Sequence, residues 1–301
     1  MNRILITGGT GLLGKALIET NRDARISSIY LGSYSMADRA NVSYHKADIC
    51  DTNMLEGIFR QTRPQVVIHT AGIANVDYCE KNYDEAYRAN VIGTRNITDL
   101  AREFGAKMVF ISTNAVFDGK SAPYSEDSTP SPINLYGKMK VESEGILKKS
   151  GLKHLIVRPI LMYGWNNKHE RPNTVTWLIK KLQNGDRVNI VNDVYENPLL
   201  NVSCAEIIWE LINLNKEGIY HIAGRDAVNR HAFAKTIADV FNLDSSLIDE
   251  VSSDFFHSLA PRPRNTSYNT SKIENELNIR MLGLGEGLNT MKNMRKNTYE
   301  A

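Results

Sequence analysis

Cysteine is scarce in this sequence of 301 residues, which contains only Cys50, Cys79 and Cys204. No two of them have the spacing of a metal site, and an odd number cannot pair completely. The run His169-Glu170-Arg171 also lacks a second metal ligand at a useful spacing. We therefore expect reduced thiols, as in cytoplasmic proteins, and no metal site.

The sequence also lacks a dominant charge and a long apolar run. Its 36 basic and 34 acidic residues give a formal charge of +2, too small a field to indicate binding to nucleic acid or to an anionic membrane. No apolar stretch approaches the roughly 18 residues of a membrane span. The first expected strand begins at Arg3, which leaves no room for a signal peptide. We expect a cytoplasmic protein.

Short apolar strands alternate with helical patterns in the first half of the chain, which is typical of a parallel α/β sheet. The expected strands are Arg3–Thr7, Ser28–Leu31, Val42–Lys46, Val66–Thr70, Met108–Ser112 and His154–Arg158. The expected helices between them are Leu12–Thr20, Thr52–Gln61, Tyr83–Phe104 and Tyr136–Lys149. The sequence thus predicts a Rossmann-type, doubly wound sheet with ligands at the carboxyl ends of its strands.

The regular alternation stops after Gly164, which indicates a second, smaller α/β domain. We assign residues 1–165 to a dinucleotide-binding domain and expect residues 194–224, with a helix and the strand Gly218–Ala223, to return to it. Residues 166–193 and 225–301 are assigned to an interleaved substrate-binding domain, in which Trp165 and Trp177 are expected to pack.

A glycine-rich turn, Thr7–Gly14, follows the first strand directly and opens an amphipathic helix. Its glycines can make the tight turn, admit a pyrophosphate to the backbone and let helix and strand pack closely. The unpaired N–H groups at the helix start then face the phosphate charge. We expect Gly8, Thr10, Gly11, Leu12, Leu13 and Gly14 to bind NAD or NADP.

The choice between the two cofactors depends on the end of the second strand. An acid about 20 residues beyond the turn would bind the ribose 2′-hydroxyl of NAD, but no carboxylate appears there before Asp38. Ser33 and Arg39 could instead hold the 2′-phosphate of NADP. We expect NADP, with NAD possible, unless Arg39 belongs only to a surface loop.

The pair Tyr136 and Lys140 lies four residues apart on one helical face. A nearby ammonium favours the phenolate, so we expect Lys140 to lower the pKa of Tyr136 toward the working range of an acid–base catalyst. Ser112 and Thr113 end the fifth strand, where a hydroxyl can hold a substrate carbonyl near the tyrosine. His69, in a buried strand, is expected to be a hydrogen-bonded core residue.

Together these residues resemble the extended short-chain dehydrogenase/reductase superfamily along essentially the whole chain. The resemblance also includes Asp48-Ile49, the run His69–Gly72 and Arg158-Pro159. It implies that Asp48 and Ile49 border the adenine and that Ala71, Gly72 and Ile73 line the cofactor.

Three stretches are similar to the dTDP-4-dehydrorhamnose reductase branch of that superfamily: Ile111–Gly119, Asn134–Lys138 and Pro261–Asn265. The branch also includes the regulatory β subunit of methionine adenosyltransferase. The resemblance implies reduction of a nucleotide-linked 4-keto-6-deoxy sugar, with Thr113 orienting the keto oxygen, Tyr136 donating the proton and Lys140 supporting it. Its implied substrate-binding residues are Thr113, Asn114, Tyr124, Leu161 and Arg262, although Tyr124 and Arg262 could also be ordinary loop residues.

The sequence departs from its relatives at several points. Asn114-Ala115 replaces the Asp-Glu of sugar dehydratases, which argues against dehydration. Leu161 replaces a reductase tryptophan, and Glu196–Leu199 replaces a Gly-x-Pro-Thr run. Two alternatives stay open: a nucleotide-sugar epimerase or dehydrogenase, and a non-catalytic NADP-binding regulatory subunit. The superfamily also suggests a homodimer through the helices near Tyr83–Phe104 and Tyr136–Lys149.

Overall fold

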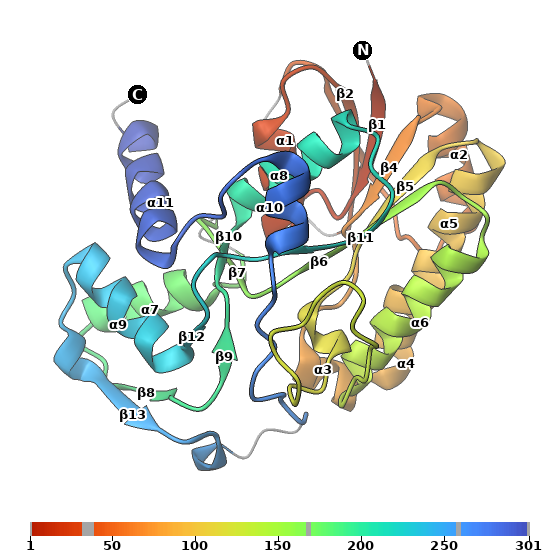
Figure 1. Cartoon of the computed structure of the whole chain (residues 1–301). Coiled ribbons are helices and arrows are strands. Elements are labelled where there is room, and N and C mark those ends of the chain that lie inside the picture. Colours follow the sequence, from red (N-terminus) through yellow and green to blue (C-terminus); the bar gives the residue numbers. More distant parts are fainter. Residues whose placement is uncertain (1, 32–38, 167–169, 257–259, 300–301) are drawn as a thin grey trace.

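The computed structural model describes residues 2–31, 39–166, 170–256 and 260–299 (Figure 1). At its centre is a parallel sheet with the strand order β11-β6-β5-β4-β1-β2-β3. These strands are β1 (Arg3–Thr7), β2 (Arg25–Tyr30), β3 (Val42–Lys46), β4 (Val66–His69), β5 (Lys107–Ile111), β6 (His154–Pro159) and β11 (Gly218–Ile222). The doubly wound fold expected from the sequence is confirmed.

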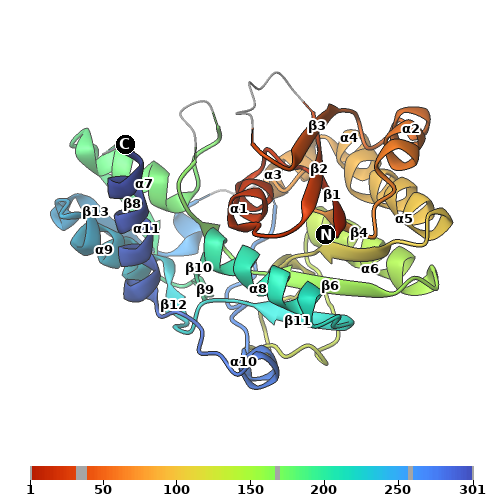
Figure 2. The same ribbon diagram turned by 90° about the horizontal axis from the view of Figure 1, so that it is seen from above.

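Helices cover both faces of this sheet (Figure 2). One face carries α1 (Leu12–Thr20) and α8 (Asn201–Asn213), and the other carries α2 (Thr52–Thr62), α5 (Gly93–Glu103) and α6 (Leu135–Lys149). The central strands β4 and β5 are buried along their whole length because both faces are covered.

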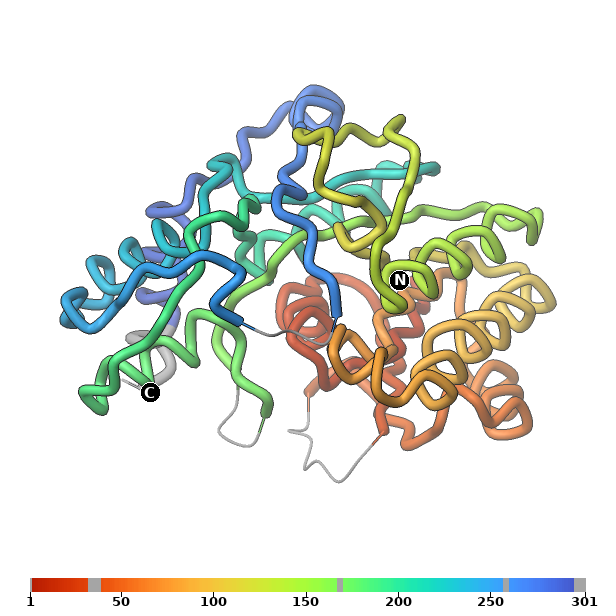
Figure 3. Tube along the Cα trace, turned by 90° about the horizontal axis from the view of Figure 1, so that it is seen from below, coloured from red at the N-terminus to blue at the C-terminus, as the bar shows by residue number. Residues whose placement is uncertain are grey.

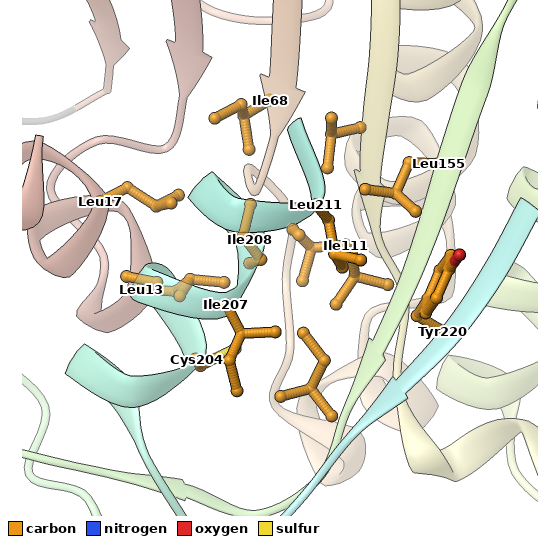
Figure 4. Close-up of a cluster of buried hydrophobic side chains, with 14 of the residues drawn as sticks. Leu13, Leu17, Ile68, Ile111, Leu155, Cys204, Ile207, Ile208, Leu211 and Tyr220 are labelled. Carbon is orange, nitrogen blue, oxygen red and sulfur yellow. The ribbon is translucent and has the colours of Figure 1, made fainter. Parts of the chain in front are cut away.

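The core beneath α8 explains why the chain returns to the sheet after leaving it. Leu17 of α1 and Ile208 of α8 lie in one apolar cluster with Leu155 of β6 (Figure 4). The next strand, β11, pairs with β6 in parallel, with Tyr220 opposite Val157. The sheet therefore gains a seventh strand from a segment that follows part of the second lobe.

A second lobe packs around its own apolar core, which includes Leu178, Phe233 and Leu288. It contains α7 (Thr174–Gln183), α9 (Arg230–Phe241), α11 (Leu284–Tyr299), β8 (Val188–Val191) and β13 (Ile248–Val251). Short strand pairs join β7 (Met162–Tyr163) to β10 (Leu199–Leu200) and β9 (Tyr195–Glu196) to β12 (Val228–Asn229). Trp165 donates its indole N–H to the carbonyl of Met291 at 2.6 Å, and Trp177 packs against the same core.

The segment that precedes α10 (Ser271–Leu277) runs between the two lobes (Figure 3). Asn265 pairs with Tyr195 of the second lobe, and Tyr268 pairs with Tyr124 beside the sheet. The two lobes are therefore connected through backbone pairing as well as by the chain itself.

The helical run expected at Tyr83–Phe104 is not uniform. It consists of α4 (Tyr83–Tyr87), a π-helical turn at Arg88–Ile92 and α5. The turn contains Asn90, whose buried side chain is hydrogen-bonded to the backbone N–H and to the carbonyl of Ile73, both at 3.0 Å. The π-helical turn thus coincides with a contact between distant parts of the chain. The helix α3 (Val76–Lys81) was not expected from the sequence. No described helix combines the length and the apolar character needed to cross a membrane.

Candidate active site

A cleft of about 1540 Å³ lies at the carboxyl ends of the sheet strands, facing the second lobe. Its wall includes Gly11 at the start of α1, Thr113 after β5 and Tyr136 on α6. The opposite wall comes from the second lobe and from the segment between the lobes, and includes Val194 and Arg262. The cleft therefore lies at the edge of the sheet where the sequence predicts that ligands bind.

The glycine turn forms the floor at one end of this cleft. Gly8 has φ +74°, and a Cβ there would lie 2.8 Å from the backbone nitrogen of Ala71. A Cβ on Gly14 would lie 2.3 Å from the carbonyl oxygen of Gly8, so helix and turn pack too closely for any other residue. Gly11 caps α1 without a side-chain bond, which leaves backbone N–H groups available to an anion. This cradle fits the pyrophosphate of a dinucleotide.

Every residue assigned to this turn lines the cleft: Gly8, Thr10, Gly11, Leu12, Leu13 and Gly14. The residues expected near the adenine and along the cofactor do so as well: Asp48, Ile49, Ala71, Gly72 and Ile73. Asp48 accepts a hydrogen bond from the backbone of Cys50 at 2.8 Å, which holds the loop after β3 in place.

Only one of the two residues expected to select NADP belongs to the part of the chain that the structure describes. Ser33 lies outside the described residues. Arg39 is not among the residues that line the cleft, and its guanidinium is 3.6 Å from the carboxylate of Glu19, with both side chains about half exposed. In this conformation Arg39 is therefore a surface residue, as the alternative interpretation of its loop had it.

The expected catalytic residues come together at the start of α6. Asn134 accepts a hydrogen bond from the backbone of Gly137 at 2.9 Å and so begins the helix. A Cβ on Gly137 would lie 2.1 Å from the carbonyl oxygen of Ala115, so the helix start packs directly on the turn after β5. This close packing allows a side-chain hydrogen bond between Thr113 and Tyr136.

Burial, rather than the neighbouring lysine, dominates the ionisation of the tyrosine. Burial raises the pKa of Tyr136 to about 12, and a hydrogen bond with Thr113 opposes this rise. Lys140 is not among the causes, so the expectation that it lowers this pKa was wrong. Burial also lowers the pKa of Lys140 to about 8. The Lys140 ammonium donates to the carbonyl of Ile111 at 2.8 Å. At neutral pH the phenol therefore holds its proton while the lysine is mostly charged.

The two hydroxyls at the end of β5 have different surroundings. The Ser112 hydroxyl donates to Oε1 of Glu144 at 2.7 Å. Glu144 is also bound by Arg158, and both of these side chains are almost completely buried. Because Ser112 is bonded to this ion pair, Thr113 is the hydroxyl that remains beside Tyr136.

Not all residues expected to contact the substrate lie in the wall of the cleft. Asn114, Leu161 and Arg262 line the cleft, and Arg262 donates to Asp77 at 2.8 Å. Tyr124 does not line the cleft, which corrects its assignment to the substrate. Its ring is buried, and its hydroxyl donates to Asp118 at 2.7 Å because the loop after β5 folds back on itself.

His69 is a core residue, as expected. Its ring nitrogens are hydrogen-bonded to Thr7 at 2.6 Å and Thr94 at 3.1 Å, and burial lowers its pKa to about 3. The neutral imidazole, with both ring nitrogens hydrogen-bonded, therefore links β4 to β1 and α5 and does not line the cleft.

The cleft wall also contains Glu196 and Arg230, to which no role was assigned from the sequence. Arg230 donates to Glu196 at 2.6 Å, and Asn114 donates to the other carboxylate oxygen at 3.0 Å. The only sign of Glu196 in the sequence was that residues 196–199 depart from the reductase pattern. Nothing local indicated Arg230, which follows Glu196 by 34 residues.

Comparisons with known proteins agree with this architecture. The family model described as the RmlD substrate binding domain matches residues 1–295. The chain is 29% identical over 290 residues to methionine adenosyltransferase 2 subunit beta of Pongo abelii, covering 94% of this chain and 83% of that protein. It is 28% identical over 264 residues to the spore coat polysaccharide biosynthesis protein SpsK of Bacillus subtilis, covering 87% of each.

Among solved structures, a dTDP-4-dehydrorhamnose reductase from Bacillus anthracis, crystallised in complex with NADP, superimposes with a TM-score of 0.87. That chain is 28% identical, and the match covers 97% of this chain and 99% of the other. The similarity therefore extends over both lobes and the cleft between them.

Proposed function

Since the chain belongs to the family of the RmlD substrate binding domain, we propose that it reduces the keto group of a nucleotide-linked 4-keto-6-deoxy sugar with NADPH or NADH. The observation that carries the proposal is the joint position of Thr113, Tyr136 and Lys140 on the wall of a cleft that begins at the uncapped start of α1. The reductase-like structural neighbour bound to NADP supports NADPH as the preferred cofactor.

In this mechanism, the glycine turn and the N–H groups of α1 bind the pyrophosphate, and Asp48 and Ile49 border the adenine. The chemistry that the cofactor supplies when bound is a hydride. Thr113 orients the keto oxygen, and Tyr136 donates its phenolic proton to that oxygen as the carbon gains hydride. The carbonyl double bond becomes C–H and O–H bonds, and the phenolate left on Tyr136 regains a proton from water. Lys140 would hold the nicotinamide ribose beside the sugar.

The ionisation of the site supports reduction as the direction. Tyr136, whose pKa is raised to about 12 by burial, holds the proton that a reductase must deliver. Arg262 lines the cleft and can leave the partly exposed Asp77 to neutralise a substrate diphosphate.

The test is oxidation of NADPH, followed by its absorbance, with dTDP-4-dehydrorhamnose as the sugar. Tyr136→Phe should lower kcat by several orders of magnitude while the Kd for NADPH stays nearly unchanged, because the ring is kept and only the proton is lost. Near-normal turnover by this variant would contradict the assignment. The same assay with NADH compares the two cofactors.

A second candidate is a non-catalytic subunit of a larger assembly. It is favoured by the relatives named methionine adenosyltransferase 2 subunit beta, to which the similarity covers nearly the whole chain. Tight NADPH binding without turnover of a panel of keto sugars, together with a stable complex with a methionine adenosyltransferase, would favour this candidate over the reductase.

A further inference from the structure

A carboxylate stands in the cleft wall where the two lobes meet. Glu196 belongs to β9, lines the cleft and is only 8% exposed. A buried carboxylate is costly unless other groups bind it, so its surroundings indicate what holds it there.

Both oxygens of Glu196 are anchored, one from each side of the cleft. Asn114, after β5, donates to Oε1 at 3.0 Å, and Arg230, on α9, donates to Oε2 at 2.6 Å. A carboxylate has about four acceptor positions, so these two bonds leave capacity for further donors. The Arg230 charge balances that of Glu196, which makes the pair tolerable in a partly buried wall.

The amide of Asn114 is occupied by its neighbours. Its nitrogen donates to Thr266 at 2.7 Å as well as to Glu196, and its oxygen accepts from Thr113 at 3.3 Å. Asn114 therefore positions both Glu196 and Thr113. The acceptor that this part of the wall offers to a ligand is the carboxylate.

Hydrogen bonds connect this carboxylate to the proposed proton donor. Tyr136 is bonded to Thr113, Thr113 to Asn114, and Asn114 to Glu196. Thr113, Tyr136 and Glu196 line the same cleft, so a sugar whose keto oxygen lies between the first two can turn hydroxyl groups of its ring toward Glu196.

We propose that Glu196, oriented by Asn114 and Arg230, is a specificity-determining residue that accepts hydrogen bonds from hydroxyl groups of the sugar ring. The inference rests on the proposed function and deepens it. An ionised carboxylate only accepts hydrogen bonds, so it favours rings that carry hydroxyl donors. Rings that lack them leave the buried carboxylate poorly solvated and are rejected.

Equilibrium binding tests this role without depending on turnover. Calorimetry on the NADP⁺-saturated protein would give the Kd for dTDP and for dTDP-rhamnose, and the ratio of the two is the contribution of the sugar. We expect Glu196→Ala to reduce this contribution roughly 10- to 100-fold, with the Kd for dTDP unchanged. Glu206→Ala, an exposed glutamate on α8, is the matched control and should leave the ratio unaltered.

Arg230→Ala separates sugar recognition from the mere loss of the ion pair. It breaks the ion pair as fully as Glu196→Ala does but keeps the carboxylate, so we expect the ratio to change by less than about 5-fold. Equal losses in the two variants, or an equal effect of Glu196→Ala on dTDP and dTDP-rhamnose, would overturn the inference. Glu196→Gln, which keeps the side-chain volume, should show an intermediate loss.

The same measurements distinguish failure of the proposed function from failure of the inference about Glu196. A wild-type protein that binds neither dTDP nor dTDP-rhamnose overturns the proposed function, and the inference with it. A wild-type protein that binds and reduces its sugar, while Glu196→Ala keeps the full contribution of the sugar, overturns the inference alone.

Discussion

The buried ion pair between Glu144 and Arg158 gives the sharpest prediction for stability. Arg158 donates to the two carboxylate oxygens at 2.8 and 2.7 Å, and the two side chains are only 2% and 1% exposed. Removing one partner leaves an uncompensated buried charge, which costs about 3–5 kcal/mol. We expect Glu144→Met at the upper end of this range. Arg158→Met belongs at the lower end, because the Lys148 ammonium, 3.5 Å from Glu144, can partly replace the lost charge.

The double variant Glu144→Met/Arg158→Met distinguishes this reasoning from simple loss of packing. It removes both charges and keeps most of the volume, so the main remaining cost is the unbonded hydroxyl of Ser112, about 1–3 kcal/mol. The double variant should therefore be more stable than Glu144→Met alone. Urea denaturation, followed by circular dichroism, measures the free energy of unfolding of all three variants.

The exposed pair of Glu56 and Arg60 on α2 is the matched control, since its replacement by Met should change stability by no more than about 1 kcal/mol. If Glu144→Met costs no more than this control, or if the double variant loses the sum of the two single losses, the reasoning is refuted.

The pH dependence of this effect has a defined sign. Burial alone would raise the pKa of Glu144, but the hydrogen bonds and charge of Arg158 outweigh it and hold the pKa below its ordinary value. A lowered pKa in the folded state stabilises the protein above the unfolded pKa of about 4.3 and loses that effect as the pH falls through the folded value. The difference between wild type and Glu144→Met should thus be constant from pH 7 to about 5 and shrink in stronger acid.

Three further predictions concern the cleft. Gly14→Ala should abolish NADPH binding in calorimetry, because its Cβ would lie 2.3 Å from the carbonyl oxygen of Gly8. Gly145→Ala is the matched control. It has open space around it on α6 and should stabilise the chain by up to about 1 kcal/mol in urea denaturation. The kcat of reduction should fall as the pH rises above about 8, where Lys140 loses its charge, and a flat profile to pH 10 would contradict this role. Arg39→Ala should raise the KM for NADPH roughly tenfold and spare that for NADH if Arg39 leaves Glu19 to bind the 2′-phosphate; equal values for both cofactors would assign it to the surface.

The sequence predicted that the glycine turn and Tyr136 with Lys140 would line one cleft, because these features depend on local backbone geometry. The turn at Thr7–Gly14 requires glycines for its own conformation, since Gly8 has φ +74° and Gly14 packs on Gly8. The spacing of Tyr136 and Lys140 places both on one helical face. These features lie within single elements, so the sequence pattern contains nearly all the information.

The failures have a common physical origin in contacts between distant residues. Tyr124 was assigned to the substrate from its place in a loop, yet its buried position depends on pairing with Tyr268. The pKa of Tyr136 was expected to be lowered by Lys140, yet burial, which only the folded chain determines, raises it. Side-chain direction and depth are properties of the assembled core, and no spacing along the chain encodes them directly.

The same distinction applies to the two halves of the cleft. Asn114 is held by Glu196 and Thr266, which follow it by 82 and 152 residues. The wall around Asn114 is thus built by segments that meet only after both lobes have folded, while the glycine turn contacts neighbouring strands and loops of the sheet lobe alone. Substitutions at Glu196 should consequently alter the choice of sugar without altering the Kd for NADPH. If they weakened cofactor binding equally, the two halves of the cleft would have to be coupled through the position of the second lobe.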